Sequence, residues 1–209
     1  MAEPPIGLRQ RKKQARRTAL REIAWRMAIE HGLDGVTVEG IARAADVSPR
    51  TFFNYFSSKE EAVVDRSRAN ALALVDAFRA RPRQEDLVTA MHTVARQILD
   101  ENHEVSREWL RRSQLMRESP SLRPHILAAH SAVERSLAEA IAERSGTDVD
   151  ADLYPMLAAV SILGAWRVAG TRWAENGASS LSELMRAALE QLAAGMATPL
   201  PGTVAGAAT

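Results

Sequence analysis

The residues best suited to a chemical role lie between positions 48 and 56, where polar and basic side chains recur on one side of a short helical pattern. Ser48 is a preferred N-cap residue, and Pro49 stands at the first helical position, where its missing N–H leaves no partner unsatisfied. Side chains on the outer face of this helix could bond phosphates or base edges, and Arg50 could hold a guanine with two hydrogen bonds. We expect the outward residues to be Pro49, Arg50, Thr51, Asn54 and Tyr55.

A second short helix must position the first, because a helix that begins at Ser48 and is this brief is not stable alone. The pattern predicts that helix over Val38 to Ala45, capped by Thr37, with a tight turn through Asp46 and Val47. Two helices joined in this way form a helix-turn-helix, in which the second helix enters the DNA major groove. On spacing alone, an ordinary helical hairpin with a polar outer face remains an alternative. The apolar residues that can close over the shared face are Val38, Ile41, Ala42, Ala45, Val47, Phe52 and Phe56.

Positive charge is concentrated at the N-terminal end, although the net charge of the chain is only +1. Residues 1–56 hold ten Lys or Arg against six Asp or Glu, whereas residues 57–209 hold seventeen against twenty. Between positions 8 and 21 there are seven basic residues, Arg16 and Arg17 among them, and no acidic one. Alone, this segment is typical of a solvated basic tail. Just before a helix-turn-helix, it is interpreted as an arm that neutralises phosphate or enters the minor groove.

The stretch TVEGIARAADVSPRTFFNYFSSKEE resembles the DNA-binding signature of the TetR family of bacterial one-component regulators, from Thr37 through the aromatic run to Glu61. Two positions depart from the common pattern. Asp46 stands where the turn usually carries Gly, and Asp tolerates the left-handed conformation better than most residues. Phe53 stands where many members have a Tyr that touches DNA, so we expect one phosphate contact fewer. The resemblance implies DNA contacts from Thr37, Ser48, Pro49, Arg50, Thr51, Phe53, Asn54, Tyr55 and Lys59.

Composition limits the remaining functions. The chain has 209 residues, 46% of them hydrophobic, and no Cys, so disulfide and thiolate chemistry are excluded and a cytoplasmic location is expected. It contains no apolar N-terminal signal segment and no run of 18 uncharged apolar residues. His125 and His130 are five residues apart and do not share a helix face as paired metal ligands would. We therefore expect no enzyme activity, no cofactor, no metal site and no membrane insertion.

Helical periodicity continues to the end of the chain and predicts an all-α protein of about nine helices. We expect a basic arm and DNA-binding domain over 1–57, a helical effector-binding and dimerisation domain over 58–197, and a disordered tail over 198–209. A long helix from Ser58 to about Arg81 would join the two domains. The expected helices are 10–30, 38–45, 48–56, 58–81, 85–100, 105–117, 121–144, 153–176 and 181–196.

A ligand pocket is expected among the helices between Ala69 and Trp166, where Met and Trp offer bulky, adaptable linings for an apolar molecule. For at least half of the candidate residues, plain core is the better individual interpretation. The candidates are Phe78, Met91, Val94, Ala95, Ile98, Trp109, Leu110, Met116, Ile126, His130, Val133, Leu163 and Trp166.

The last two helices carry apolar residues on more than one side, so each needs more than one partner. They could be the core of one subunit. The resemblance implies instead that they pair with their copies in a four-helix dimer interface, which would present two reading helices to a palindromic site. The expected interface residues are Leu153, Leu157, Val160, Gly164, Val168, Leu181, Leu184, Met185, Ala188 and Leu192.

A further segment, from Ser106 to Gly146, together with GLRQRKKQARRTAL, is similar to the TetR subgroup whose C-terminal domain binds acyl-CoA-like ligands and which includes mycofactocin-type regulators. This resemblance implies a repressor released from operator DNA by an acyl-CoA or fatty-acyl ligand. A repressor that responds to planar apolar drugs is one alternative. A helical DNA-associated protein that acts through a protein partner, without an effector, is another. The residues implied near the ligand's phosphates are Arg107, Arg111, Arg112 and Arg117.

Overall fold

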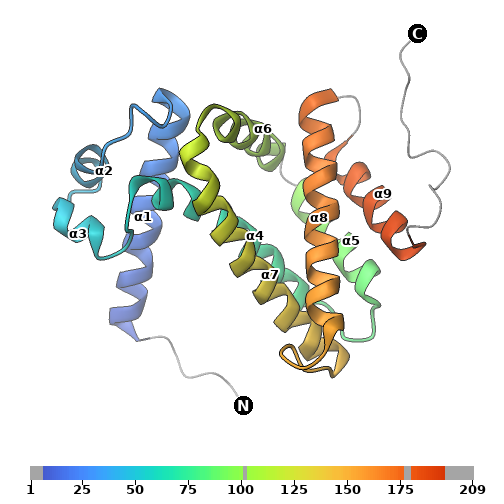
Figure 1. Ribbon diagram of the computed structural model, residues 1–209. Coiled ribbons are helices and arrows are strands. Elements are labelled where there is room, and N and C mark those ends of the chain that lie inside the picture. The colour runs from blue at the N-terminus through green and yellow to red at the C-terminus, as the bar shows by residue number, and fades with distance from the viewer. Residues whose placement is uncertain (1–6, 101–102, 177–179, 196–209) are drawn as a thin grey trace, which may run out of the picture. The chain divides into compact units, whose positions relative to one another are not determined.

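The computed structural model describes residues 7–100, 103–176 and 180–195, and within these ranges every regular element is a helix (Figure 1). The all-α prediction is confirmed, with nine α-helices and one short 3-10 helix in the described part of the chain. Their bounds are α1 (Leu8–His31), α2 (Val38–Ala44), α3 (Pro49–Phe53), α4 (Lys59–Arg79), α5 (Leu87–Asp100), α6 (His103–Glu118), η1 (Pro120–Leu122), α7 (Arg123–Ser145), α8 (Leu153–Asn176) and α9 (Leu181–Ala193). The tail expected over 198–209 lies outside the described residues.

The chain forms two compact units, and three helices contribute to both. The first unit contains the chain up to Ala69 together with Leu115–Ala129, and the second contains Asn70–Gln114 and the chain from His130 onward. The chain passes between the units within α4, α6 and α7. Ser57 belongs to the first unit, and the functional domain boundary expected near it stays a prediction.

The first unit has its own hydrophobic core, built around the helix-turn-helix. Periodic apolar residues of α1, among them Leu20, Ala24 and Ala28, are buried against Ile41 of α2 and Phe52 of α3. α1 ends where Gly32 takes a positive φ of 70°, a conformation that a side chain would strain. The five residues of α3 cannot sustain a helix alone, so this core holds it in place.

Side-chain caps begin both helices of the motif, as the sequence predicted. Thr37 Oγ1 accepts from the Gly40 N–H at 3.0 Å, and Ser48 Oγ accepts from the Thr51 N–H at 3.1 Å. Asp46, in the turn between them, has a φ of 53°. This is the left-handed conformation that the sequence required at this position, and Asp adopts it without a glycine.

The segment Leu115–Ala129 belongs to the core of the first unit, although it is distant in sequence from the helix-turn-helix. Leu115 and Leu122 are buried in the same cluster as Leu20 and Phe52, and Ile126 packs against that cluster. The helix expected to begin at Ser121 is preceded by the 3-10 turn η1, and α7 begins at Arg123. The buried side chains of Leu115, before this turn, and Leu122, at its end, hold the segment in the core.

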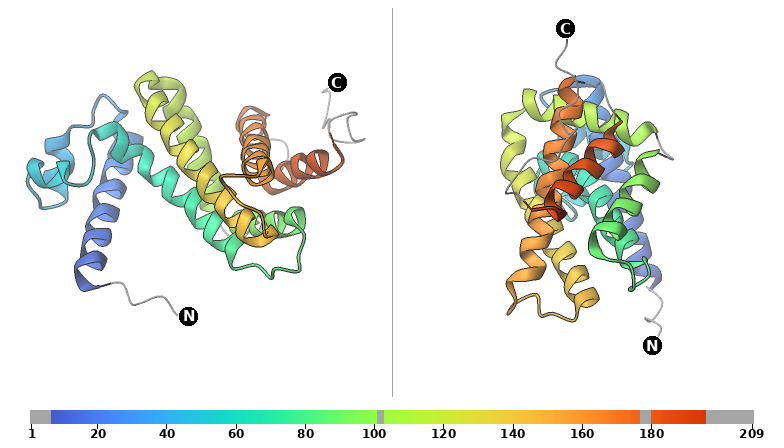
Figure 2. Two further views of the ribbon diagram at one scale, coloured as in Figure 1. Left: turned by 60° about the horizontal axis from the view of Figure 1, so that its bottom comes forward. Right: turned by 90° about the vertical axis from the view of Figure 1, so that its right-hand side faces the viewer.

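The second unit packs the end of α4 with α5, α7, α8 and α9 around a separate apolar core. α9 lies against both α8 and α5, and the α8–α9 pair is visible in orange and red in Figure 2. The Arg144 guanidinium closes the loop between α4 and α5, because it donates to the carbonyls of Pro82 at 2.5 Å and Glu85 at 2.5 and 3.2 Å. The ring of Phe78 lies 5.3 Å below the same guanidinium. The loop is thus tied to the core rather than left as a loose connection.

The two sides of α8 differ in burial, although both are apolar. Ala159, Ile162 and Trp166 are buried in the core of the second unit. On the other side, Leu153 is 86% exposed and Leu157 is 66% exposed. By length and composition alone, residues 153–175 could cross a membrane, but the same helix carries Arg167 and Arg172 and packs on α9. Exposed apolar faces of this kind are typical of surfaces that make intermolecular contacts.

Candidate nucleic-acid interface

α3 separates its residues into a buried side and an exposed side. Phe52 is fully buried, whereas Pro49, Arg50 and Asn54 are exposed, with Asn54 as the C-cap of the helix. Phe53 is 56% exposed and meets the ring of Phe52 edge-on, with 5.5 Å between the ring centroids. The exposed groups include a guanidinium and an amide, which are the two groups best suited to base-edge recognition. α3 thus has the composition of a reading helix.

Thr51 and Tyr55 are half-buried, so they are less available than the sequence suggested. The hydroxyl of Thr51 lies 2.9 Å from Ser48 Oγ, which ties it to the cap of its own helix. Ser48 and Thr37 are exposed, but each accepts a backbone N–H as a cap. Their contacts with DNA, like those of the exposed residues of α3, remain predictions.

Lys59 was expected to contact DNA, but its ammonium group is engaged inside the protein. Lys59 Nζ donates to the carbonyls of Leu33 at 3.0 Å and Val36 at 2.8 Å. These carbonyls lie in the loop between α1 and α2, which therefore depends on the first residue of α4 for its shape. The structure places Lys59 as a support of the motif.

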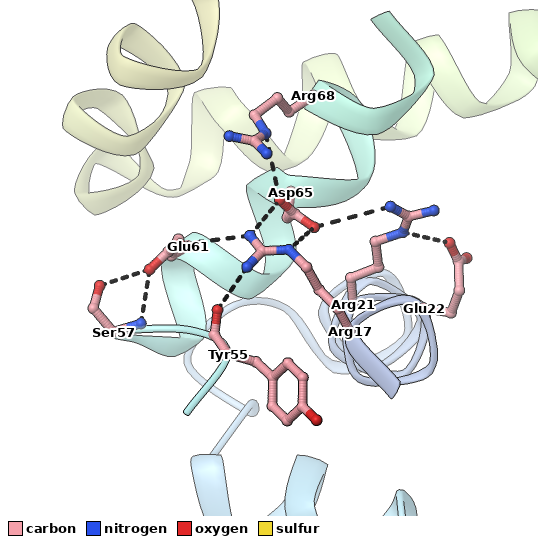
Figure 3. Close-up of polar contacts among 8 residues, drawn as sticks. All are labelled: Arg17, Arg21, Glu22, Tyr55, Ser57, Glu61, Asp65 and Arg68. Atoms are coloured by element: carbon pink, nitrogen blue, oxygen red, sulfur yellow. Dashed lines mark hydrogen bonds and ion pairs between the residues drawn. The ribbon is translucent and has the colours of Figure 1, made fainter. Parts of the chain in front are cut away.

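Arg17 is likewise bound to protein groups on three sides (Figure 3). Its Nε and one terminal nitrogen donate to the two carboxylate oxygens of Asp65, at 3.2 and 2.7 Å. Its other terminal nitrogen donates to the Tyr55 carbonyl at 2.7 Å, and its guanidinium carbon lies 4.3 Å from the ring centroid of Phe56. Three of the five N–H donors of Arg17 are therefore used inside the protein, and a DNA contact by Arg17 stays a prediction. Arg16, one residue earlier, is exposed.

Sequence reasoning missed the acidic partners in this network. Asp65 is only 5% exposed and lies within reach of three arginines, with Arg21 at 4.0 Å and Arg68 at 3.5 Å in addition to Arg17. A signal was present, because this Asp directly follows the buried residues Ala62, Val63 and Val64, where an unpaired charge would be costly. What could not be known was which basic residue of α1 would face it.

Glu61 connects the same network to the residues that follow the reading helix. Its Oε2 accepts from both the N–H and the hydroxyl of Ser57, each at 2.7 Å, and its other oxygen lies 3.7 Å from Arg17 (Figure 3). Burial raises the pKa of Glu61, but the two Ser57 hydrogen bonds, followed by the charges of Arg17 and His125, hold the pKa below its usual value. The carboxylate is thus kept ionised where it anchors the chain between α3 and α4.

The basic segment begins as helix rather than as an extended arm. α1 starts at Leu8, and the basic residues of its first turns are all exposed. Helical spacing distributes their charges along one rod, which can follow phosphates of the DNA backbone. These residues are Arg9, Arg11, Lys12, Lys13 and Arg16.

The candidate ligand residues divide between the two units. Most belong to the core of the second unit, against which Ile98 and Leu163 pack partly buried. His130 and Leu110 lie in the second unit but are exposed. Met116 and Ile126 belong instead to the first unit, and Ile126 packs on the helix-turn-helix core. Periodicity along α6 and α7 could not reveal this, because each of these helices packs in one core at one end and in the other core at the other end. The fully packed candidates are Phe78, Met91, Val94, Ala95, Val133 and Trp166.

Two side chains among these candidates carry polar groups that bear on ligand chemistry. Trp166 is 5% exposed, and its buried indole N–H finds no acceptor among the described residues. His130 is exposed, yet desolvation by the atoms packed around it, and then the positive charge of Arg112, lower its pKa. Of the arginines expected near ligand phosphates, Arg117 falls in the first unit. The side chains of Arg107 and Trp109 lie outside the described residues.

The expected dimer residues also separate into two groups. On α8, Leu153, Leu157, Val160 and Val168 are exposed, and Gly164 is half-buried with open space where a Cβ would stand. On α9, Leu181 and Met185 are buried in the core of their own protomer, so neither is available to a partner. Both helices have apolar residues on several sides, and the sequence could not show which side the protomer covers. The remaining expected residues, which are partly buried, are Leu184, Ala188 and Leu192.

Comparison with known proteins identifies both parts of the chain. Residues 20–64 match the family described as bacterial regulatory proteins, tetR family, and residues 85–197 match the MftR C-terminal domain. The chain is 32% identical over 195 residues to the HTH-type transcriptional regulator TcmR of Streptomyces glaucescens, which covers 89% of this chain and 86% of the relative. It is 26% identical over 178 residues to the mycofactocin biosynthesis transcriptional regulator MftR of Mycobacterium tuberculosis, which covers 84% of this chain and 88% of the relative.

A similar fold is found in a solved repressor. FadR of Thermus thermophilus, a TetR-family transcriptional repressor solved in complex with lauroyl-CoA, superposes with a TM-score of 0.57 at 21% identity, over 91% of this chain and 100% of that one. The likeness at this identity concerns the fold. The family is shown by the two family matches and by the 32% identity to TcmR. The chain belongs to the TetR family of DNA-binding transcriptional regulators and carries a C-terminal domain of the MftR type.

Proposed function

We propose that this regulator is a cytoplasmic, homodimeric repressor that binds a palindromic operator and is released from it by an apolar ligand of the acyl-CoA or fatty-acyl class. The family supplies DNA binding, and the exposed side of α3 supplies a guanidinium and an amide for base recognition. Repression, the two-fold symmetric dimer on a palindromic site and the class of ligand are our proposals.

Dimerisation is supported by the open apolar face of α8. Its exposed residues are spaced one or two helical turns apart, from Leu153 through Leu157 and Val160 to Val168. A two-fold pair of such faces would bury them all, since an isologous interface places each patch against its own copy. Two reading helices related by the same axis would fit half-sites about 34–36 Å apart, and such half-sites form a palindrome.

The single observation that carries the effector proposal is the indole N–H of Trp166. A buried donor without an acceptor costs about 1–3 kcal/mol, and a ligand oxygen placed beside it would recover that free energy. The surrounding side chains are apolar, which suits a ligand with a long hydrocarbon part and a single carbonyl. The lauroyl-CoA complex of a repressor with this fold makes the acyl thioester the first class to test.

The test is a titration of lauroyl-CoA into a protein–DNA complex, followed by fluorescence anisotropy of the DNA. The DNA is a site selected from a random pool with the full chain, and free CoA serves as the control for phosphate charge. We expect lauroyl-CoA to release the DNA in a saturable manner while free CoA does not. If acyl-CoAs of every chain length leave the complex intact and planar aromatic molecules release it, the multidrug interpretation replaces this one. If neither releases it, the protein acts through a protein partner.

A further inference from the structure

Arg17 joins the reading helix to α4 through one planar group. Two of its N–H donors hold the carboxylate of Asp65 on α4, and a third holds the carbonyl of Tyr55, the residue after the C-cap of α3. A guanidinium presents its donors in a fixed plane. The hydrogen bonds from Arg17 to Asp65 and to Tyr55 therefore have linked directions. A change in the orientation of the Asp65 carboxylate would move the Tyr55 carbonyl as well.

The reading helix depends on such contacts for its orientation. α3 has only five residues, and its C-terminal end leads directly into the chain that Arg17 and Glu61 hold. The guanidinium also covers Phe56, whose ring is fully buried 5.7 Å from that of Phe52. One arginine thus contacts both the backbone and the aromatic core immediately behind α3.

Asp65 gives this arrangement its rigidity. Its carboxylate is almost fully buried, so it cannot exchange Arg17 for water without leaving a charge desolvated. Arg21 and Arg68 lie within ion-pair distance, which fixes the carboxylate further (Figure 3). The Arg17–Asp65 pair connects α1, the first part of α4 and the end of α3, all of which belong to the first unit.

We propose that Arg17 is a positioning residue for specific DNA recognition, which sets the angle of the reading helix by holding the Tyr55 carbonyl and the Asp65 carboxylate together. It makes no contact with the DNA itself. Sequence-specific binding depends on that angle, because base edges must be met in register. Binding to non-specific DNA depends mainly on phosphate charge and tolerates a tilted helix.

The first test compares R17K with R17Q, using the selected DNA site and an unrelated sequence at several salt concentrations. Lysine keeps the charge but is a point donor that cannot reproduce the fork. We expect both variants to lose about tenfold or more in affinity for the selected site. The slope of log K against log salt should stay that of the wild type. If R17K binds like the wild type while R17Q loses about one unit of slope, Arg17 is a phosphate ligand and the proposal is overturned.

The second test uses D65N, for which charge and positioning predict opposite results. If only charge matters, removing a negative charge near DNA should tighten binding. If the Arg17–Asp65 pair positions the reading helix, its loss should weaken binding to the selected site and leave binding to non-specific DNA unchanged. The matched control is E30Q, because Glu30 is an exposed acidic residue of α1 that pairs with His31. We expect E30Q to bind as the wild type or slightly tighter.

The double variant R17Q/D65N should lose no more affinity than the weaker-binding single variant, because both changes break the same pair. Circular dichroism and the melting transition report the fold of each protein. Should D65N fail to fold, R17K decides alone, since it preserves the charge. A D65N protein that folds and binds the selected site as tightly as the wild type contradicts the proposal, as does simple additivity of the two changes.

Discussion

Arg50 is the residue whose loss should affect base recognition most directly. It is exposed on α3, so removing its side chain should leave the core intact. If it bonds a guanine through two hydrogen bonds, R50A should lower the affinity for the selected site by about 1–3 kcal/mol and relax the base preference there. Anisotropy titrations measure both effects. R96A, which removes an exposed arginine from α5, is the control for charge alone. Equal behaviour of the two variants would contradict a base contact by Arg50.

Replacing Trp166 should affect ligand binding more than stability. W166F keeps most of the apolar volume but removes a buried donor that lacks an acceptor among the described residues. The melting temperature of the free protein should therefore not fall by more than a few degrees. Affinity for lauroyl-CoA should fall about five- to tenfold if its carbonyl accepts from this N–H, an effect of about 1–1.5 kcal/mol. Calorimetry of both proteins tests this, and an unchanged affinity would remove Trp166 from the polar contacts.

At the scale of elements, the basic first turns of α1 should act on every DNA sequence alike. Deleting residues 1–13 removes Arg9, Arg11, Lys12 and Lys13, which lie far from the buried stripe that begins at Leu20. Affinity should fall for specific and non-specific DNA together. The salt slope should drop by about one unit for each phosphate that the shortened protein no longer neutralises. An unchanged slope would mean that these residues are only a solvated end of the helix.

The elements themselves were largely predictable, because their ends carry local signals. Thr37 and Ser48 cap helices through their own side chains, and Asp46 turns the chain in the left-handed conformation, as expected from residue type alone. The role of Arg17 was not predictable. It depends on a partner 48 positions away on α4, and a basic run in a sequence looks the same whether one member is exposed or bound. The hydrogen bonds of Lys59 to the loop between α1 and α2 were unpredictable for the same reason.

At the scale of the whole molecule, periodicity located the helices but could not assign each half of a helix to a core. Ile126 and Val133 lie on the same helix, yet the first packs in the unit of the reading helix and the second in the unit of α8 and α9. The sequence also could not distinguish the apolar face that α8 buries from the one it leaves open. These assignments depend on tertiary contacts between residues far apart in the chain.

The exposed face of α8 yields a prediction for assembly. L157E places a charge on a leucine that is 66% exposed, so the protomer should still fold, whereas a symmetric interface would bring two such charges together. Sedimentation should show a shift from dimer to monomer and weaker binding to a two-half-site DNA. L127E changes a leucine of α7 with a similar exposure of 68% and serves as the control. A dimeric L157E protein would place the interface elsewhere.

If a ligand controls release from DNA, ligand binding and DNA binding must be coupled, and the coupling must be reciprocal. If lauroyl-CoA favours the released state, DNA must weaken lauroyl-CoA binding by the same factor by which lauroyl-CoA weakens DNA binding. The measurement is calorimetry of lauroyl-CoA binding to the protein alone and to the protein saturated with its selected site. We expect lauroyl-CoA to bind the complex more weakly than the free protein by about 1–3 kcal/mol, equal to the shift in the DNA titration. Equal affinity for the free and the DNA-bound protein would contradict it.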